Sequence, residues 1–317
     1  MLPTSFEGRL RLPILVSPMF LVSGPNLVVE SCKAGVIGSF PAFNQRTSDG
    51  YEQWLKDVRA RVGDNGVPWA TQYPVHRTND RLQADFALTI KYQVPILIST
   101  IGITREVTDA VHAYGGLVFH DAINVRHAKK ALEANVDGII AVSGGAGGHS
   151  GTYNPFAFLG ELKPIMGDKT LILAGCMSDG QAVAGAIAAG ADLAYVGTRF
   201  VNTVESIASE KLKRLVLESD ITDVVYTDQV DGIGSSFLRQ TLPGDDFRED
   251  LAKGGFNISE ILEPKRWVDI LSAGQGVGAI DDIPTTAELV DRFEQGYHRA
   301  VARLGAVPLM PRVAAAS

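Results

Sequence analysis

The sequence predicts an α/β protein, a (β/α)8 barrel with a smaller inserted or appended region near its C-terminus. Apolar segments of strand length alternate with helix-like segments eight times before about residue 218. The strand segments are apolar throughout, which is typical of a parallel sheet covered on both faces. Gly or Asn stands where helices would end in the left-handed conformation, at Ala34-Gly35-Val36, Tyr114–Leu117, Asn135-Val136 and Ala189–Ala191.

The predicted strands are short apolar runs separated by turn residues. They are Leu12–Ser17, Val36–Phe40, Trp69–Tyr73, Val94–Ser99, Leu117–His120, Gly138–Val142, Thr170–Ala174 and Leu193–Val196. An open doubly wound sheet is the alternative arrangement of the same elements. It would need a Gly-x-Gly-x-x-Gly turn directly after an early strand, whereas Pro18-Met19-Phe20 follows the first strand here.

The helices between these strands have apolar residues at helical spacing or recognisable ends. We expect them at Asn26–Ala34, Tyr51–Val62, Asp80–Tyr92, Thr104–Tyr114, Asn124–Ala134, Asn154–Met166, Ser178–Ala189 and Ser206–Glu218. Asp80 is a suitable N-cap, and Ser178–Gln181 has the pattern of a capping box. Pro155 is compatible with a first helical turn.

After the last of these helices the βα alternation ends. We therefore divide the chain into a barrel at residues 1–219, an excursion packed on the barrel as a substrate-side lid at 220–278, and a closing helix and tail at 279–317. A second capping box, Thr285–Glu288, starts the closing helix, and Leu289 and Phe293 share one of its faces. We expect Val301–Ser317 to be a loosely held tail.

Composition excludes several classes of function. Hydrophobic residues make up 45% of the chain and charged residues 21%, as in a soluble globular protein. The net charge is −7 without a basic run, which argues against nucleic acid as a partner. No apolar stretch has membrane-spanning length, and residues 1–7 lack the pattern of a signal peptide. With Cys32 and Cys176 as its only cysteines, the chain is expected to be cytoplasmic, and no spacing of ligands predicts a metal site.

A barrel enzyme carries its active site at the carboxyl ends of the strands. Two glycine-containing segments follow the seventh and eighth predicted strands, at Ala174–Gly180 and Val196–Phe200. Barrels commonly hold a phosphate group at these two loops, because glycine lets backbone N–H groups face the anion and a helix N-terminus points toward it. We therefore interpret Gly175 and Gly197 as parts of a phosphate site. The alternative is ordinary turn chemistry.

The glycine-rich segment Ser143–Gly151 follows the sixth predicted strand and contains one imidazole, His149. Glycine permits close approach of the backbone to a ligand, and histidine can transfer protons near neutral pH. The alternative interpretation is a flexible surface loop with an incidental histidine. We interpret His112 and His127 as surface residues of helices. For His120, which ends a strand, contact with a cofactor or substrate and the absence of such contact are equally compatible with the sequence. For Cys176 we favour a small buried filler over a redox-active thiol.

Several of these segments together resemble the nitronate monooxygenase family, formerly called 2-nitropropane dioxygenases. The matching segments are Pro13–Met19, Val118–His120 with Val125–His127, Ala146–Gly151, Ala174–Gly180, Gly190–Asp192 with Val196–Phe200, and Ser272–Gly276. They are spread over most of the chain. The family consists of FMN-dependent (β/α)8 barrels and includes NAD(P)H:quinone reductases and enoyl-ACP reductases.

The resemblance implies roles for individual residues. His149 would be the catalytic histidine near the flavin ring, and Gly175, Gly197 and Thr198 would donate hydrogen bonds to the FMN phosphate. Pro18 and Met19 would lie beside the ring, Gln72 would contact its polar edge, and Gln275 would close over the site. The complete set of predicted cofactor-binding residues is Pro18, Met19, Gln72, His120, Gly147, Gly148, Gly175, Cys176, Met177, Gly197, Thr198 and Gln275.

The chain departs from the family pattern at three of these loops. Cys176 replaces the second glycine after the seventh strand, which leaves a backbone donor in place. Asp121 replaces a lysine after the strand-five histidine and removes a positive charge from the cofactor's side. Gly145 stands where relatives often have an acidic residue, so the substrate pocket is expected to differ.

The function implied by the resemblance is an FMN-dependent nitronate monooxygenase, which would convert alkyl nitronates or nitroalkanes and O2 into a carbonyl compound and nitrite. The cofactor would supply the redox chemistry and the protein its orientation. The alternatives are an NAD(P)H-dependent reductase of a quinone or an enoyl thioester, and a flavin-free phosphate-binding aldolase or isomerase. The sequence leaves open whether NAD(P)H is used and whether the chain forms a homodimer.

Overall fold

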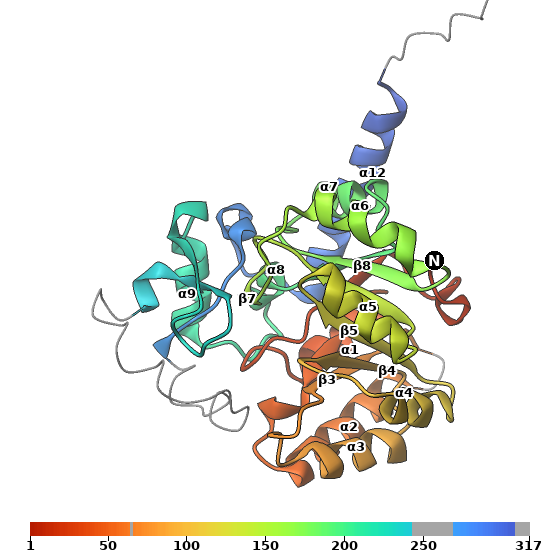
Figure 1. Cartoon of the computed structure of the whole chain (residues 1–317). Helices are drawn as coiled ribbons and strands as arrows, with labels where there is room; N and C mark the ends of the chain where they lie inside the picture. The colour runs from red at the N-terminus through yellow and green to blue at the C-terminus, as the bar shows by residue number, and fades with distance from the viewer. Residues whose placement is uncertain (64–65, 243–268, 308–317) are drawn as a thin grey trace, which may run out of the picture.

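Eight parallel strands form a closed barrel in the computed structural model, which describes residues 1–63, 66–242 and 269–307 (Figure 1). In sheet order they are β1 (Ile14–Val16), β9 (Leu193–Val196), β8 (Thr170–Ala174), β6 (Gly138–Val142), β5 (Leu117–Ala122), β4 (Ile96–Thr100), β3 (Ala70–Pro74) and β2 (Ser39–Pro41). The Val16 N–H donates to Ile37 O at 2.8 Å, which joins the two ends of the sheet. This closure confirms the predicted TIM barrel and excludes the open doubly wound sheet.

Helices cover the outside of the barrel, one after each strand. They are α1 (Pro25–Lys33), α2 (Ser48–Val62), α3 (Leu82–Lys91), α4 (Arg105–His112), α5 (Val125–Glu133), α6 (Pro155–Met166) and α7 (Gly180–Ala188). The eighth position is taken by α12 (Thr286–Gly305), which packs against both α7 and α1. The helix predicted at Ser206–Glu218 exists as α9 (Glu210–Glu218) but packs against the 3₁₀ helix η6 (Gln275–Ala279), so its assignment to the barrel's outer ring was wrong.

The barrel interior and the layer between strands and helices are separate apolar cores. Side chains such as Leu15, Ile98 and Ile172 fill the interior. Phe6, from the 3₁₀ helix η1 (Thr4–Phe6), joins them and meets the ring of Phe119 edge-to-face, with 6.4 Å between ring centroids. Strand residues buried on both faces explain why the strands are apolar throughout.

The four predicted helix-to-strand junctions are confirmed. Gly35, Gly115, Asn135 and Gly190 have φ angles of +91°, +83°, +63° and +104°, so each lies in the left-handed region that favours glycine or asparagine.

The helix starts were predicted less well. Arg81, not Asp80, is the N-cap of α3, and Asp179, not Ser178, caps α7 by accepting from Ala182 N–H at 2.8 Å. The capping box at Thr285 and Glu288 is present, and it starts α12 as predicted.

A second, smaller sheet connects the glycine-rich segment with the excursion. Its antiparallel order is β10 (Val224–Thr227), β11 (Ser235–Leu238) and β7 (Gly148–His149). The Tyr226 hydroxyl also donates to Ser150 O at 3.2 Å. Short helices η3 (Ile221–Asp223), η4 (Arg239–Thr241) and η2 (Ala42–Asn44) and the single turn α8 (Thr198–Val201) complete the described elements.

The C-terminal helix is longer than predicted. α12 runs to Gly305, so the expectation of a loosely held tail is wrong for residues 301–305, and residues 308–317 of that prediction lie outside the described residues. The division of the chain at residues 219 and 278 stays a prediction, and residues 243–268 of the expected lid lie outside the described residues. Among the helices that the structure describes, none is long and apolar enough to cross a membrane.

Candidate active site

A cavity of about 1090 Å³ opens at the carboxyl ends of the barrel strands. Every predicted site residue except Gln275 contributes to its wall: Pro18, Met19, Gln72, His120, Gly147, Gly148, His149, Gly175, Cys176, Met177, Gly197 and Thr198. The volume is slightly above the range of about 300–1,000 Å³ that is usual for small-molecule sites. The barrel therefore gathers residues from six widely separated segments around one space.

The loop after β8 has a backbone conformation suited to an anion. Gly175 has φ +131° and Cys176, unusually for a residue with a side chain, has φ +57°. A Cβ atom on Gly175 would lie 2.5 Å from Ser143 Oγ, so only glycine fits there. Successive residues in such conformations can direct their N–H groups into one concavity, and α7 begins a few residues later with its positive end toward it. These features fit a phosphate group.

The loop after β9 leaves room for a ligand rather than for a side chain. A Cβ atom on Gly197 would meet Ser17 Cβ at 3.5 Å and Met19 Sδ at 3.7 Å, so a larger side chain would extend into the cavity wall. The neighbouring Thr198 Oγ1 accepts a hydrogen bond from Gly274 N–H at 2.8 Å. The hydroxyl hydrogen of Thr198 is then still available as a donor toward an anion.

The segment around η6 is hydrogen-bonded to the glycine-rich loop and to the loop after β8. Gln275 N–H donates to Gly145 O at 2.9 Å, and Ser178 Oγ donates to Gly276 O at 2.8 Å. Gly274 and Gly276 contribute to the cavity wall, whereas Gln275 does not. A Cβ atom on Gly145 would overlap Cys176 Sγ and lie 2.9 Å from Gln275 Oε1. This crowding, together with a φ of +86° at Gly145, explains why the chain has glycine at that position.

His149 lies at the end of β7 and is held by a carboxylate. Its Nε2 is 2.6 Å from Asp231 Oδ2, and the Asp231 side chain is fully buried. Asp231 Oδ1 accepts from Ile233 N–H at 2.9 Å. A neutral imidazole that donates from Nε2 has Nδ1 as its acceptor nitrogen, so this pair fixes both the ring orientation and the tautomer.

Asp231 is the partner of His149 that the sequence analysis missed. It lies 82 residues from His149, and β11, which pairs with β7, brings it there. The Asp231-Gly232 pair is a turn signal, and Gly232 indeed has φ +82°. A turn signal does not reveal which distant side chain the turn will contact.

His120 and Asp121 are adjacent on β5, and the protein environment disfavours the charged form of each. His120 Nδ1 lies 2.8 Å from Ser99 Oγ, and burial, with a smaller contribution from His127, lowers the pKa of His120 to about 4. Burial raises the pKa of Asp121 to about 7, against the effect of a hydrogen bond to Thr100. Within the described residues, Asp121 Oδ1 has no hydrogen-bond partner. No arginine or lysine among residues 1–63, 66–242 and 269–307 forms an ion pair with this carboxyl group.

Two predictions about individual side chains are wrong. Cys176 is exposed and contributes to the cavity wall, so it is not a buried filler. His127 is half-buried and also lines the cavity instead of facing solvent on a helix surface. His112 is partly buried and bonds Asp137 Oδ2 through Nε2 at 2.8 Å.

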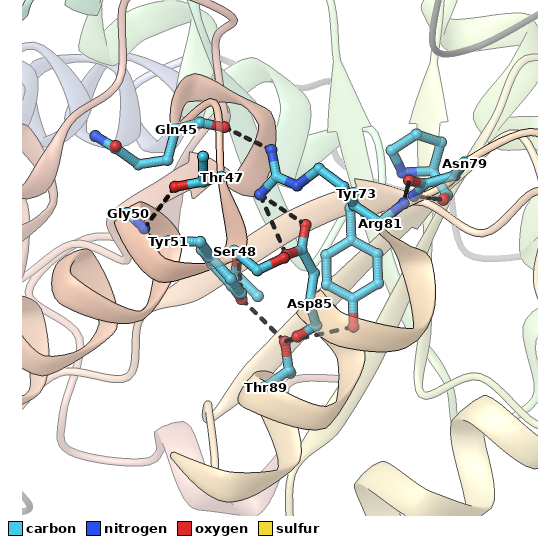
Figure 2. Close-up of polar contacts among 12 residues, drawn as sticks. Gln45, Thr47, Ser48, Gly50, Tyr51, Tyr73, Asn79, Arg81, Asp85 and Thr89 are labelled. Carbon is cyan, nitrogen blue, oxygen red and sulfur yellow. Dashed lines mark hydrogen bonds and ion pairs between the residues drawn. The ribbon is translucent and has the colours of Figure 1, made fainter.

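The opposite wall of the cavity rests on a network of buried side chains (Figure 2). Asp85 is fully buried and pairs with Arg81 at 2.9 Å, and Ser48 donates to its Oδ1 at 2.7 Å. Arg81 also donates to Gln45 O at 2.6 Å. The Arg81 guanidinium lies 5.1 Å from the ring centroid of Phe43, a residue of the cavity wall. The network therefore holds Phe43, an aromatic residue, in the cavity wall.

Comparisons with known proteins agree with this arrangement. A family model described as nitronate monooxygenase matches residues 8–242. A nitronate monooxygenase from Neurospora crassa is 26% identical, over 66% of this chain and 65% of that protein. A (3aS,4S,5R,7aS)-5-hydroxy-7a-methyl-1-oxo-octahydro-1H-indene-4-carboxyl-CoA dehydrogenase from Rhodococcus jostii is 22% identical, over 93% of this chain and 95% of that protein.

Solved structures share the fold. A nitroalkane oxidase from Streptomyces ansochromogenes superimposes with a TM-score of 0.82 at 22% identity, covering 95% of this chain and all of the other. FabK from Thermotoga maritima has a TM-score of 0.77 at 22% identity, with coverages of 94% and 96%.

Proposed function

The chain belongs to the nitronate monooxygenase family, and we propose that it is an FMN-dependent enzyme that oxidises alkyl nitronates with O2 to a carbonyl compound and nitrite. Membership makes it an oxidoreductase of a family of flavoenzymes. The observation that carries the finer proposal is the occurrence of a glycine-lined anion cradle, at Gly175 and Gly197, in the same cavity as His149. The cradle suits a single phosphate, as in FMN.

The residues of the cavity have distinct roles in this proposal. When bound, FMN supplies the redox chemistry. The loops at Gly175–Met177 and Gly197-Thr198 hold its phosphate, and Pro18, Met19 and Gln72 bound the space for its ring. Phe43, held by Arg81, adds an apolar surface that excludes water. Asp121, whose pKa is raised to about 7, would act as a hydrogen-bonding group beside the ring, where relatives have a positive charge.

His149 would handle the proton or the anion of the substrate. With Nε2 directed at Asp231, its Nδ1 can accept a proton from the carbon of a neutral nitroalkane. Once protonated, the imidazolium is stabilised by the Asp231 carboxylate and can hold the anionic nitro group.

The experiment is cofactor identification followed by anaerobic mixing. The cofactor released by heat should have the mass of FMN, and FAD or a flavin-free protein would contradict the proposal. Propyl-2-nitronate should then bleach the bound flavin rapidly, and nitrite should appear when O2 is admitted.

A second candidate is an NAD(P)H-dependent or thioester-directed flavin enzyme of the same fold. The favouring observation is the relative from Rhodococcus jostii, whose name specifies a carboxyl-CoA substrate and which matches 93% of this chain. In the mixing experiment, rapid bleaching by NADPH with slow bleaching by nitronate would select this candidate.

A further inference from the structure

The loop after β1 holds one bulky residue in a backbone conformation that its side chain disfavours. Leu21 has a φ angle of +58°, in the left-handed region, which costs such a residue a factor of roughly 5–30 in population. Of the five non-glycine residues with positive φ in the described part of the chain, Gln93 and Asn135 follow the ends of helices, whereas Leu21, Ile101 and Cys176 line the active-site cavity. Strain of this kind persists only where the surrounding structure imposes it.

The side chain of Asn44 holds Leu21 in this conformation. Its Oδ1 accepts a hydrogen bond from the Leu21 N–H at 2.7 Å. Its Nδ2 donates to Ser23 O at 2.7 Å and to Met19 O at 3.0 Å. Asn44 belongs to η2 and is half-buried, and it is not part of the cavity wall. It can therefore affect a ligand in the cavity only through the loop that it holds.

An asparagine side chain supplies the combination of groups that this loop needs. The Leu21 N–H requires an acceptor, whereas the carbonyl groups of Met19 and Ser23 require donors, and one side-chain amide offers both. An aspartate would keep the acceptor but would place its second oxygen against two carbonyl oxygens. The contacts of Asn44 are thus specific to the left-handed course of the loop.

The loop held by Asn44 lies directly against the glycine loop that follows β9. Ser23 Oγ accepts from the Met19 N–H at 3.0 Å and donates to Ser17 O at 3.4 Å. A Cβ atom on Gly197 would lie 3.5 Å from Ser17 Cβ and 3.7 Å from Met19 Sδ. The parallel pairing of β1 with β9 brings these two loops together. A change in the conformation of Leu21 would therefore reach Met19 and the wall of the phosphate site.

We propose that Asn44 is a positioning residue for the cofactor, because it holds Leu21 in the left-handed conformation and thereby keeps Pro18 and Met19 in place beside Gly197 and the space for the ring. The inference rests on the proposed function, since it takes FMN to be the ligand of this cavity. The loop is ordered in its binding conformation before the ligand arrives, which lowers the cost of binding. Asn44 contributes to FMN affinity without contact to FMN.

The test is a double-mutant cycle between Asn44→Ala and Leu21→Gly, measured by the FMN dissociation constant and by the visible spectrum of the bound flavin. Asn44→Ala should raise the dissociation constant roughly tenfold and shift the spectrum, because Leu21 then leaves the strained conformation. Glycine adopts positive φ without this cost. On the Asn44→Ala background, Leu21→Gly should therefore tighten FMN binding by at least about threefold relative to its effect in the presence of Asn44.

Two controls separate this mechanism from a general loosening of the protein. Phe20→Gly changes a neighbouring residue without positive φ, so on the Asn44→Ala background it should not tighten FMN binding. Asn154→Ala removes an asparagine that accepts from two backbone N–H groups at the start of α6 and does not line the cavity. It should lower the stability and leave the FMN dissociation constant within about twofold of the wild type.

Asn44→Asp carries the same comparison if Asn44→Ala fails to fold, because it retains the acceptor for the Leu21 N–H. Wild-type FMN affinity and an unshifted spectrum in the Asn44 variant would overturn the inference. It would also be overturned if adding Leu21→Gly gave no better binding than the Asn44 variant alone. Either result leaves the proposed function intact, which fails instead if the wild type lacks FMN or does not oxidise propyl-2-nitronate. Recovery with Leu21→Gly but not with Phe20→Gly would support the role of Asn44.

Discussion

The two sides of the active-site cavity are built by different means. On the side of α2 and α3, the walls are fixed by buried side chains, with Asp85 joined to Arg81 and Ser48, and Tyr51 bonded to Thr71 and Thr89 (Figure 2). On the side of β6 and β8, the loops are fixed by backbone conformation. Their residues adopt positive φ angles at Gly145, Gly148, Gly175 and Cys176.

The difference separates stability from ligand binding. A side-chain network loses several hydrogen bonds when one member is removed, so substitutions within it lower the free energy of unfolding. A glycine-lined loop presents backbone donors to a ligand, so substitutions within it mainly lower the affinity for that ligand. We therefore expect substitutions on the first side to change the free energy of unfolding, and substitutions on the second side to change cofactor binding and turnover.

The largest effect is expected for Asp85→Ala. Removing one partner of a buried ion pair typically costs about 3–5 kcal/mol, and Arg81 is partly exposed, so a loss of about 3 kcal/mol in the free energy of unfolding is expected. Asp109→Ala is a matched control, because Arg105 and Asp109 form the same i,i+4 pair with both side chains 59% exposed. Its cost should stay below about 0.5 kcal/mol. Chemical denaturation measures both, and equal losses would refute the contrast between buried and surface pairs.

His149→Ala should have the next largest effect, this time on turnover. General-base catalysis contributes about 10²–10⁴ in rate, so kcat/KM for neutral nitroalkanes should fall by at least about 10² while FMN stays bound. Preformed nitronate requires no deprotonation at carbon, so its rate should fall less. Asp231→Asn should lower the nitroalkane rate by a smaller factor, because the base His149 is still present and only the carboxylate that orients it is lost. Unchanged rates on both substrates would remove His149 from the mechanism.

Asp121 offers a direct comparison with Asp85, since its Oδ1 is buried and no guanidinium of the described part of the chain pairs with it. Its pKa is raised from 3.8 to about 7, so the folded protein retains a proton that the unfolded chain releases. Stability should therefore decrease as the pH rises from about 4 to about 7. Asp121→Asn cannot ionise, so its stability relative to the wild type should be higher at pH 8 than near pH 4 by on the order of 4 kcal/mol, because the pKa shift is about three units. Parallel pH profiles for the two proteins would contradict this assignment.

The sequence predicted elements that depend on local patterns. Apolar runs located the eight strands, and Gly35, Gly115, Asn135 and Gly190 marked the helix ends, because left-handed residues leave a local signature. Barrel topology then placed His149 and the loops after β8 and β9 on one rim without further information.

Long-range partners could not be predicted in this way. The contact of Asp231 with His149 depends on the pairing of β11 with β7, and nothing in either segment specifies that pairing. The eighth outer helix was assigned to α9 because α9 follows β9 more closely in sequence. α12 takes that place because its buried face, including Leu289 and Phe293, packs against α7 across an intervening excursion.

Gly197→Val should reduce cofactor affinity more than stability. The added side chain would project toward Ser17 and Met19 in the cavity wall and displace the phosphate, so the FMN dissociation constant should rise by on the order of tenfold. Gly160→Val serves as the control, because a side chain there meets nothing within 4 Å on an exposed face of α6. Fluorescence of released FMN measures the two affinities. Full flavin occupancy in Gly197→Val at low protein concentration would exclude Gly197 from the cradle.

The smallest effect is expected for Cys176→Gly. Cys176 has φ +57°, a conformation that costs a residue with a Cβ atom roughly 1–2 kcal/mol. Glycine removes this cost but gives the unfolded chain more conformational freedom, which offsets roughly 0.5–1 kcal/mol of the gain. The variant should therefore be more stable by about 0.5–1 kcal/mol and keep its FMN, since the backbone N–H is unchanged. Cys176→Ser retains the Cβ atom and should show no gain in thermal denaturation. A destabilised Cys176→Gly would mean that the thiol contributes packing that outweighs the backbone strain, and that this side of the cavity also depends on a side chain.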